Sequence, residues 1–174
     1  MKSIFIFIFF LFQVNYVYAN NNVVFLDVQF IIDNSDIGIF YKKKIKTTQD
    51  KIKSEIIKKE KTIKETEIDL ESKKNILNKD ELNKSLKNLE GLISEYRIYR
   101  NEKRKLVLDE KKKYSSKILQ ILNPILTEFV EKNSIDLVLD KKNILVGAKI
   151  LDITKNLTLL LNEETKKLNL IDEN

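Results

Sequence analysis

The chain has 174 residues, of which 43% are hydrophobic and 33% are charged, and its formal net charge is +6. It contains no Cys and no His, which excludes disulfides, Cys/His zinc sites and Ser-His or Cys-His catalysis. The sequence also lacks a phosphate-binding loop, a nucleophile elbow and any metal-ligand spacing. We therefore expect no enzymatic activity, no catalytic residues, no metal and no cofactor.

The first 19 residues have the layout of a secretory signal peptide. Lys2 precedes an apolar run from Ile4 to Phe12, and Val17 and Ala19 fit the positions before a cleavage site. The apolar run is shorter than the ~20 residues of a spanning helix, so an uncleaved membrane anchor is the weaker alternative. We expect cleavage after Ala19 and export of the remaining chain.

Positive charge is concentrated in the middle of the chain. Residues 42–117 contain 24 Lys or Arg and 14 Asp or Glu, a net of +10, whereas residues 20–41 have a net of −3 and residues 118–174 a net of −2. A basic segment attracts acidic partners such as an anionic membrane surface, nucleic acid or an acidic polypeptide. A genome biased toward Lys, Asn and Ile codons would give the same composition, so this excess alone does not identify a site.

Residues 23–30 are β-branched and aromatic, which predicts a short strand. One face of this strand carries Val24, Leu26, Val28 and Phe30. Ser35 or Asp36 is expected to cap a helix that runs from Ile37 to about Leu77. The apolar residues of this helix are sparse and partly heptad-spaced: Ile45, Ile52, Ile56, Ile63, Leu70 and Leu77. Because the companion heptad positions are mostly polar, we expect thin packing and flexibility.

Asn78-Lys79-Asp80 interrupts this pattern, and Asp80 is expected to cap a second helix. The second helix has a heptad seam that begins at Leu82, Leu86, Leu89, Ile93 and Tyr96 and continues through Arg100, Lys103, Val107, Glu110, Tyr114 and Ile118. Pro124 is expected to kink or interrupt this helix, and residues 118–130 are apolar enough for a core. The short connection predicts an antiparallel hairpin, an arm of roughly 60 Å.

Two further strands and a helix are predicted after Asn133. Residues 135–140 and 144–148 are strand-like, with Lys141-Lys142-Asn143 as the turn between them. Asp152 is expected to cap a last helix with an amphipathic face that includes Leu157, Leu160 and Leu161.

The predicted fold class is therefore α+β, with a small three-stranded β-body and a long antiparallel coiled-coil hairpin inserted in it. Residues 20–36 and 133–174 would form the body, and residues 37–132 the arm. A three-stranded sheet leaves open edges, and self-association is the simplest way to cover them. The residues expected at this oligomer interface are Val24, Leu26, Val28, Ile135, Leu137, Leu139, Ile144 and Val146.

This order of elements resembles the Skp/OmpH family of periplasmic chaperones. The matching features are the signal peptide, Val-Val-Phe-Leu-Asp-Val-Gln-Phe at 23–30, the charged hairpin, Ile-Asp-Leu-Val-Leu-Asp at 135–140, and Asp-Ile-Thr at 152–154 with the leucines that follow. The resemblance covers nearly all of residues 23–162. It implies a homotrimer whose β-body holds three helical arms around a cavity. It also implies a periplasmic, ATP-independent holdase that keeps unfolded outer-membrane proteins from aggregating.

Weak apolar contacts from the arms would bind such clients. The candidate contact residues are Ile45, Ile52, Ile56, Ile63, Leu70, Tyr96, Ile98 and Tyr99. Their heptad spacing equally favours a plain structural role in the seam between the two helices. Tyr96 and Tyr99 are not expected to face the seam together, which would leave one of them for the cavity.

Two other functions fit parts of the sequence. A cell-envelope structural or adaptor coiled coil would explain the hairpin and the export, but it needs no strand-containing body. Nucleic-acid binding is suggested only by two Lys triplets, at 42–44 and 111–113, which lie outside any recognition motif, and export would separate the chain from nucleic acid. We therefore expect no nucleic-acid partner.

Overall fold

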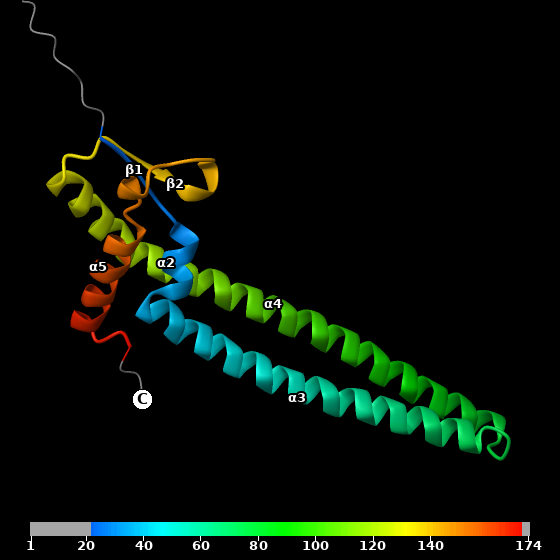
Figure 1. The fold of residues 1–174 in the computed structure, drawn as a ribbon. Coiled ribbons are helices and arrows are strands. Elements are labelled where there is room, and N and C mark those ends of the chain that lie inside the picture. Colours follow the sequence, from blue (N-terminus) through cyan, green and yellow to red (C-terminus); the bar gives the residue numbers. More distant parts are fainter. Residues whose placement is uncertain (1–21, 172–174) are drawn as a thin grey trace, which may run out of the picture.

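A computed structural model describes residues 22–171, and the predicted signal peptide lies outside these residues. Two long helices, α3 (Asp36–Lys73) and α4 (Lys79–Lys132), run antiparallel and project as an arm from a small body (Figure 1). The body contains the short helix α2 (Val28–Asn34), the closing helix α5 (Thr154–Lys167), a small sheet and the last turns of α4. The predicted α+β fold with a long helical hairpin is confirmed.

The sheet has two strands within residues 22–171, not the three predicted. Strand β1 (Val23–Leu26) pairs in parallel with β2 (Leu137–Asp140), with Val23 opposite Leu137. Residues 144–148 form no strand and no hairpin: the short 3-10 helix η1 (Lys141–Asn143) takes the place of the predicted turn, and a second one, η2 (Lys149–Leu151), follows the loop. On the second edge of β1, the chain before α5 forms a backbone hydrogen bond instead: the Ile153 N–H donates to the Phe25 carbonyl at 2.9 Å.

The first strand is shorter than predicted because Asp27 starts a helix. Its Oδ1 accepts a hydrogen bond from the Phe30 N–H at 2.8 Å, which caps α2. Val28 therefore lies on a helix and not on the strand face predicted for it. The Ser35 side chain then accepts from the Gly38 N–H at 3.2 Å and caps α3, as one of the two expected caps.

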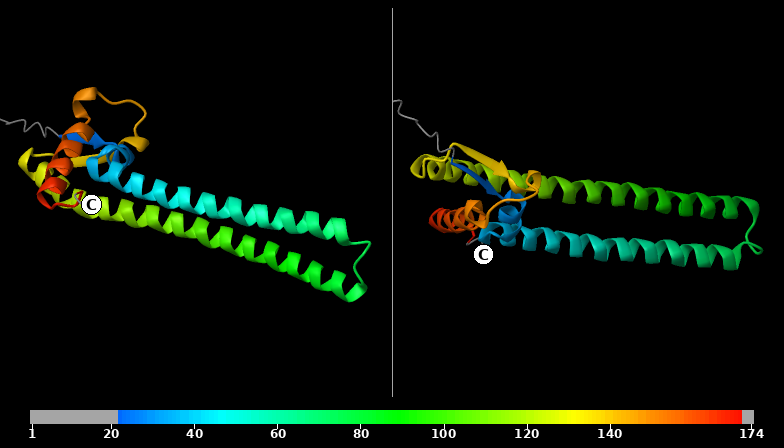
Figure 2. Two further views of the ribbon diagram at one scale, coloured as in Figure 1. Left: turned by 90° about the horizontal axis from the view of Figure 1, so that it is seen from below. Right: turned by 45° about the horizontal axis from the view of Figure 1, so that its top comes forward.

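Helix α3 lies beside α4 along the arm, and α4 continues past the start of α3 into the body (Figure 2). Asn78, not Asp80, caps α4, because its side chain and that of Glu81 bond each other's backbone N–H groups in a capping box. The helix also continues through Pro124 without the predicted interruption. Its flanking turns are held in place, since Ile118 and Leu122 before the proline are buried in the core.

One hydrophobic core joins all the elements of the body. It lies where α2, α5 and the base of α3 meet the last third of α4 (Figure 1). The buried side chains are Val24, Leu26, Ile31, Ile37, Ile118, Leu122, Ile135, Ile153, Leu157 and Leu161. None of the helices between residues 22 and 171 combines the length and hydropathy needed to cross a membrane.

Candidate functional site

Helices α3 and α4 of the arm meet along a seam of half-buried side chains. Ile45 lies in a cleft with Tyr114, and Ile63 shares another with Leu92. Five of the predicted client-contact residues are half-buried on the α3 side of this seam: Ile45, Ile52, Ile56, Ile63 and Leu70. This position agrees with the structural role in the seam that their heptad spacing also favoured.

Tyr96 and Tyr99 form a polar layer in the middle of the seam. Tyr96 donates its hydroxyl hydrogen to Glu60, and Tyr99 donates to Glu55, so both rings face α3. The expectation that only one of them faces the seam is wrong, because a step of three residues keeps both on one helical stripe. Lys103 lies 5.2 Å from the centre of the Tyr99 ring, a cation–π distance.

These hydrogen bonds hold the two tyrosines in their protonated form. The bond to the Glu55 carboxylate raises the pKa of Tyr99 to about 12. The bond to Glu60 raises the pKa of Tyr96 above its ordinary value. Farther along, the Glu110 Oε2 atom is buried and has no hydrogen-bond partner among residues 22–171. The middle of the seam is thus held by polar contacts where apolar residues are missing.

The outer faces of the arm carry exposed apolar side chains. Ile98, the one predicted client-contact residue outside the seam, is 56% exposed. Leu86 is also exposed, although its spacing placed it in the seam. Sequence reasoning missed the others because they fall between heptad positions. They are Ile57 and Ile68 on α3, Leu106 and Leu108 on α4, Ile76 in the turn at the tip, and Ile39 at the root. Ile57 and Ile68 are eleven residues apart and lie about 20° from each other around α3, on a face that otherwise carries charged residues of both signs, such as Lys64 and Asp50.

The predicted interface residues of the body fall into two groups. Val24, Leu26 and Ile135 are buried by the chain's own side chains, and Val28 and Ile144 are half-buried. Leu137, Leu139 and Val146 are exposed. Two nearby apolar residues that the sequence did not single out, Leu145 and Ile150, are also exposed, at 102% and 89%.

The loop that carries Leu145 and Val146 is tied to the sheet. A Cβ atom on Gly147 would lie 2.7 Å from the Phe25 ring, so only glycine fits there. Lys141 Nζ lies 2.8 Å from the Asp152 carboxylate. Burial acts to raise the pKa of Asp152, but the hydrogen bonds from Lys141 and Thr154 outweigh it and leave the pKa below its usual range. The loop is therefore anchored while Leu145 and Val146 remain exposed.

No cluster of three acidic side chains is placed to bind a metal ion in the part of the chain that the structure describes.

Comparison with known proteins identifies this architecture. The family model of OmpH-like outer membrane proteins matches residues 22–159. The fold is similar to a crystal structure from Caulobacter crescentus CB15 that is described as OmpH-like, with a TM-score of 0.74 and 18% sequence identity. The match covers 84% of this chain and 86% of that one. No curated protein sequence matches at a significant level. The family model spans most of the sequence, including both strands and the whole arm, and this chain belongs to the OmpH-like outer membrane protein family.

Proposed function

We propose that this chain is an ATP-independent holdase chaperone of the periplasm, which binds unfolded outer-membrane proteins and prevents their aggregation. Membership in the OmpH-like family supports a chaperone role. The similar Caulobacter structure is described as a candidate outer membrane chaperone. Export with cleavage after Ala19 would place the mature chain where such clients pass.

The observation that carries the proposal is the exposed apolar side chains on the outer faces of the arm. Ile57, Ile68 and Ile98 are each more than half exposed, and they stand apart from one another among charged residues. Each would contribute a small apolar contact, and several contacts on one client add through effective concentration. Isolated residues of this kind avoid the large apolar patch that would make the chaperone itself aggregate.

The predicted seam residues have a second part in this proposal. Ile45, Ile52, Ile56, Ile63, Leu70, Tyr96 and Tyr99 are half-buried between the helices. They would meet a client only where α3 and α4 separate, whereas Ile98 is accessible in the closed arm.

The proposed assembly is a homotrimer formed through the body. Strand β2 has one edge unpaired within the described chain, and the adjoining surface of Leu137, Leu139, Val146 and neighbouring residues is exposed. Exposed apolar edges of this kind are covered in stable proteins. The number of three subunits comes from the family resemblance. Val24, Leu26 and Ile135 would support this interface from the core side.

The test is suppression of aggregation of a urea-denatured outer-membrane β-barrel on dilution, followed by light scattering. The wild-type protein should suppress scattering at a near-stoichiometric ratio of trimer to barrel. The triple variant Ile57→Ser, Ile68→Ser, Ile98→Ser should need severalfold more protein at unchanged helix content. A matched control replaces polar residues at exposed arm positions with serine: Lys53→Ser, Lys64→Ser and Asn101→Ser. No suppression by severalfold excess of wild-type protein would refute the proposal.

A structural or adaptor role in the cell envelope is the second candidate. The arm favours it, because 38 residues of α3 form a continuous charged rod of about 57 Å. Crosslinking in cells separates the two functions. A spacer would give one fixed crosslinked partner, whereas a holdase would give several outer-membrane proteins.

A further inference from the structure

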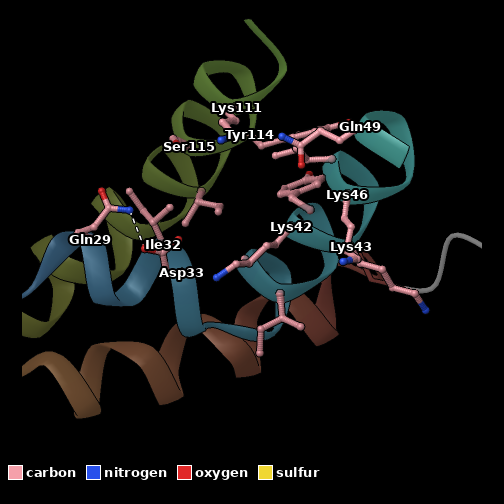
Figure 3. A pocket seen from close by; sticks show the side chains of 15 residues that line it. Gln29, Ile32, Asp33, Lys42, Lys43, Lys46, Gln49, Lys111, Tyr114 and Ser115 are labelled. Atoms are coloured by element: carbon pink, nitrogen blue, oxygen red, sulfur yellow. Dashed lines mark hydrogen bonds between the residues drawn. The ribbon is translucent and has the colours of Figure 1, made fainter. Parts of the chain in front are cut away.

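The cleft that contains Ile45 and Tyr114 lies at the root of the arm and is partly lined by the exposed Ile39. It has a volume of about 690 Å³ and lies between α2, the first turns of α3 and α4 (Figure 3). Tyr41 and Tyr114 stack in it with ring centres 4.2 Å apart, and Ile32 and Ile39 add aliphatic surface. The cleft therefore has an apolar and aromatic floor of a size that accepts one or two large side chains.

Four lysines surround this floor from both long helices. Lys42, Lys43 and Lys46 come from α3, and Lys111 comes from α4 (Figure 3). Asp33 is the one acidic residue in the lining, and it accepts a hydrogen bond from Gln29 Nε2 at 2.8 Å.

Positive charge is more unbalanced here than anywhere else in the arm. Residues 41–49 and 111–117 each contain four Lys and no acidic residue, which gives +8, whereas residues 50–110 hold 16 Lys or Arg and 14 Asp or Glu, which gives +2. Toward the tip, lysines are neutralised by near neighbours, as in the pair of Lys73 with Asp69 at 2.7 Å. Within residues 22–171 the four lysines of the cleft form no ion pair.

We propose that this root cleft binds an acidic segment of polypeptide, in which an aliphatic or aromatic side chain lies next to two or more carboxylates. The apolar side chain would occupy the floor, and carboxylates on either side of it would meet lysines on α3 and α4. Gln49 and Ser115 line the same cleft and can bond the peptide backbone. A lipid carries its charge at one end, so it would match the lysines of only one wall. The inference rests on the proposed function, since it assigns a class of client segment to a place on the arm.

Tryptophan fluorescence tests this directly, because the chain contains no Trp. The probe is the hexapeptide Asp-Asp-Trp-Leu-Asp-Asp, with Lys-Lys-Trp-Leu-Lys-Lys as its counterpart, titrated with protein purified from cells that express the full chain. We expect a blue shift and saturable binding for the acidic peptide only. Binding should weaken about tenfold in the cleft variant Lys42→Gln, Lys46→Gln, Lys111→Gln. It should be unchanged in the control variant Lys84→Gln, Lys87→Gln, Lys105→Gln, which loses the same charge at exposed positions elsewhere on α4.

Three results would overturn the inference. Equal loss of binding in both triple variants would show general charge attraction. Equal affinity for the two peptides would show that the cleft does not discriminate between acidic and basic peptides. Complete displacement of the peptide by phosphatidylglycerol vesicles, with tighter binding to the vesicles, would assign the cleft to lipid. Circular dichroism checks the fold, and Ile39→Ser, at an exposed floor position, gives a second variant that should also weaken binding.

The outcome separates this inference from the proposed function. Peptide binding in a protein that fails to suppress barrel aggregation would leave the cleft assignment and remove the chaperone role. Suppression of barrel aggregation by a protein that does not bind the peptide would leave the chaperone role and remove the cleft assignment.

Discussion

The body and the arm of this molecule are packed to very different degrees. In the body, Ile31, Ile37, Leu157 and Leu161 are completely buried. In the arm, no residue between Ile39 and Lys117 is buried, and the seam is only half-covered. The apolar residues of the body are therefore buried and stabilise the fold, whereas many of those on the arm remain accessible.

This difference indicates how the arm can work as a binding element. Regions with few buried apolar contacts open at low free-energy cost while the rest of a protein stays folded. The tyrosine–glutamate layer joins α3 to α4 in a fixed register, and the capping box at Asn78 fixes the start of α4. The arm should therefore loosen locally without loss of the body.

Core truncation should have the largest effect on stability and should confirm the contrast. Leu161→Ala, at a fully buried position, is expected to cost about 2–5 kcal/mol of the free energy of unfolding. Ile63→Ala in the half-buried seam should cost only about 1 kcal/mol, since less apolar surface is lost. Urea unfolding followed by circular dichroism measures both. Equal costs would mean that the arm is as tightly packed as the body.

An aspartate introduced at an exposed position of the body distinguishes residues that stabilise the core from residues that form the subunit interface. Leu137 is 50% exposed in the single chain, so Leu137→Asp should leave the fold intact. In the proposed trimer this charge would be buried without a partner, and the oligomer should dissociate. Leu159→Asp on α5 is the matched control, since Leu159 is 54% exposed. An unchanged mass for Leu137→Asp in light scattering would show that this surface is not the interface.

Replacing glycine with alanine should change the free energy of unfolding in opposite directions at Gly38, at the base of α3, and at Gly91, on the arm. At Gly38 an added Cβ would lie 2.0 Å from the Ile32 carbonyl oxygen, so Gly38→Ala should destabilise the chain by about 1–3 kcal/mol. At Gly91 no atom lies within 4 Å of that position, so Gly91→Ala should stabilise α4 by about 0.5–1 kcal/mol. Thermal unfolding of both variants is the measurement. Destabilisation by Gly91→Ala would reveal packing on the arm that the single chain does not show.

The smallest expected effect is a pH dependence confined to the arm. The folded chain binds the Tyr99 proton more tightly than the unfolded chain, because the hydrogen bond to Glu55 raises the pKa of Tyr99 to about 12. The stability that this bond contributes is therefore full below about pH 10, the ordinary tyrosine pKa, and is lost as the pH rises toward 12. Ultraviolet titration should show a tyrosine that ionises near pH 12 and returns to ordinary behaviour in Glu55→Gln. The same titration curve in both proteins would contradict the polar layer.

Much of the fold could be predicted from the sequence because its signals are local. The heptad spacing of Ile45 to Leu70 and the break at Asn78-Lys79-Asp80 predict the hairpin without any long-range information. The strand ends were less predictable. Asp27 acts as a helix cap in place of a strand residue. Residues 144–148 form a loop with a bend at Leu145, and Asp152 and Ile153 contact β1 instead.

The candidate surfaces were harder to predict, since exposure depends on which neighbours a helix has. Ile57 and Ile68 lie outside the heptad positions, so the heptad spacing does not predict their exposure. The root cleft joins residues from α2, α3 and α4, and Tyr41 and Tyr114 stack across 73 positions of sequence. Only the clusters of lysine at 42–46 and 111–113 hinted at it.

The most direct test of the chaperone role is the solution mass of the purified protein, alone and after mixing with a urea-diluted outer-membrane barrel. Light scattering coupled to gel filtration measures both states. We expect a trimer that takes up the barrel and elutes as one soluble complex of higher mass. A monomer or dimer whose mass does not change while the barrel precipitates would contradict the proposed holdase function.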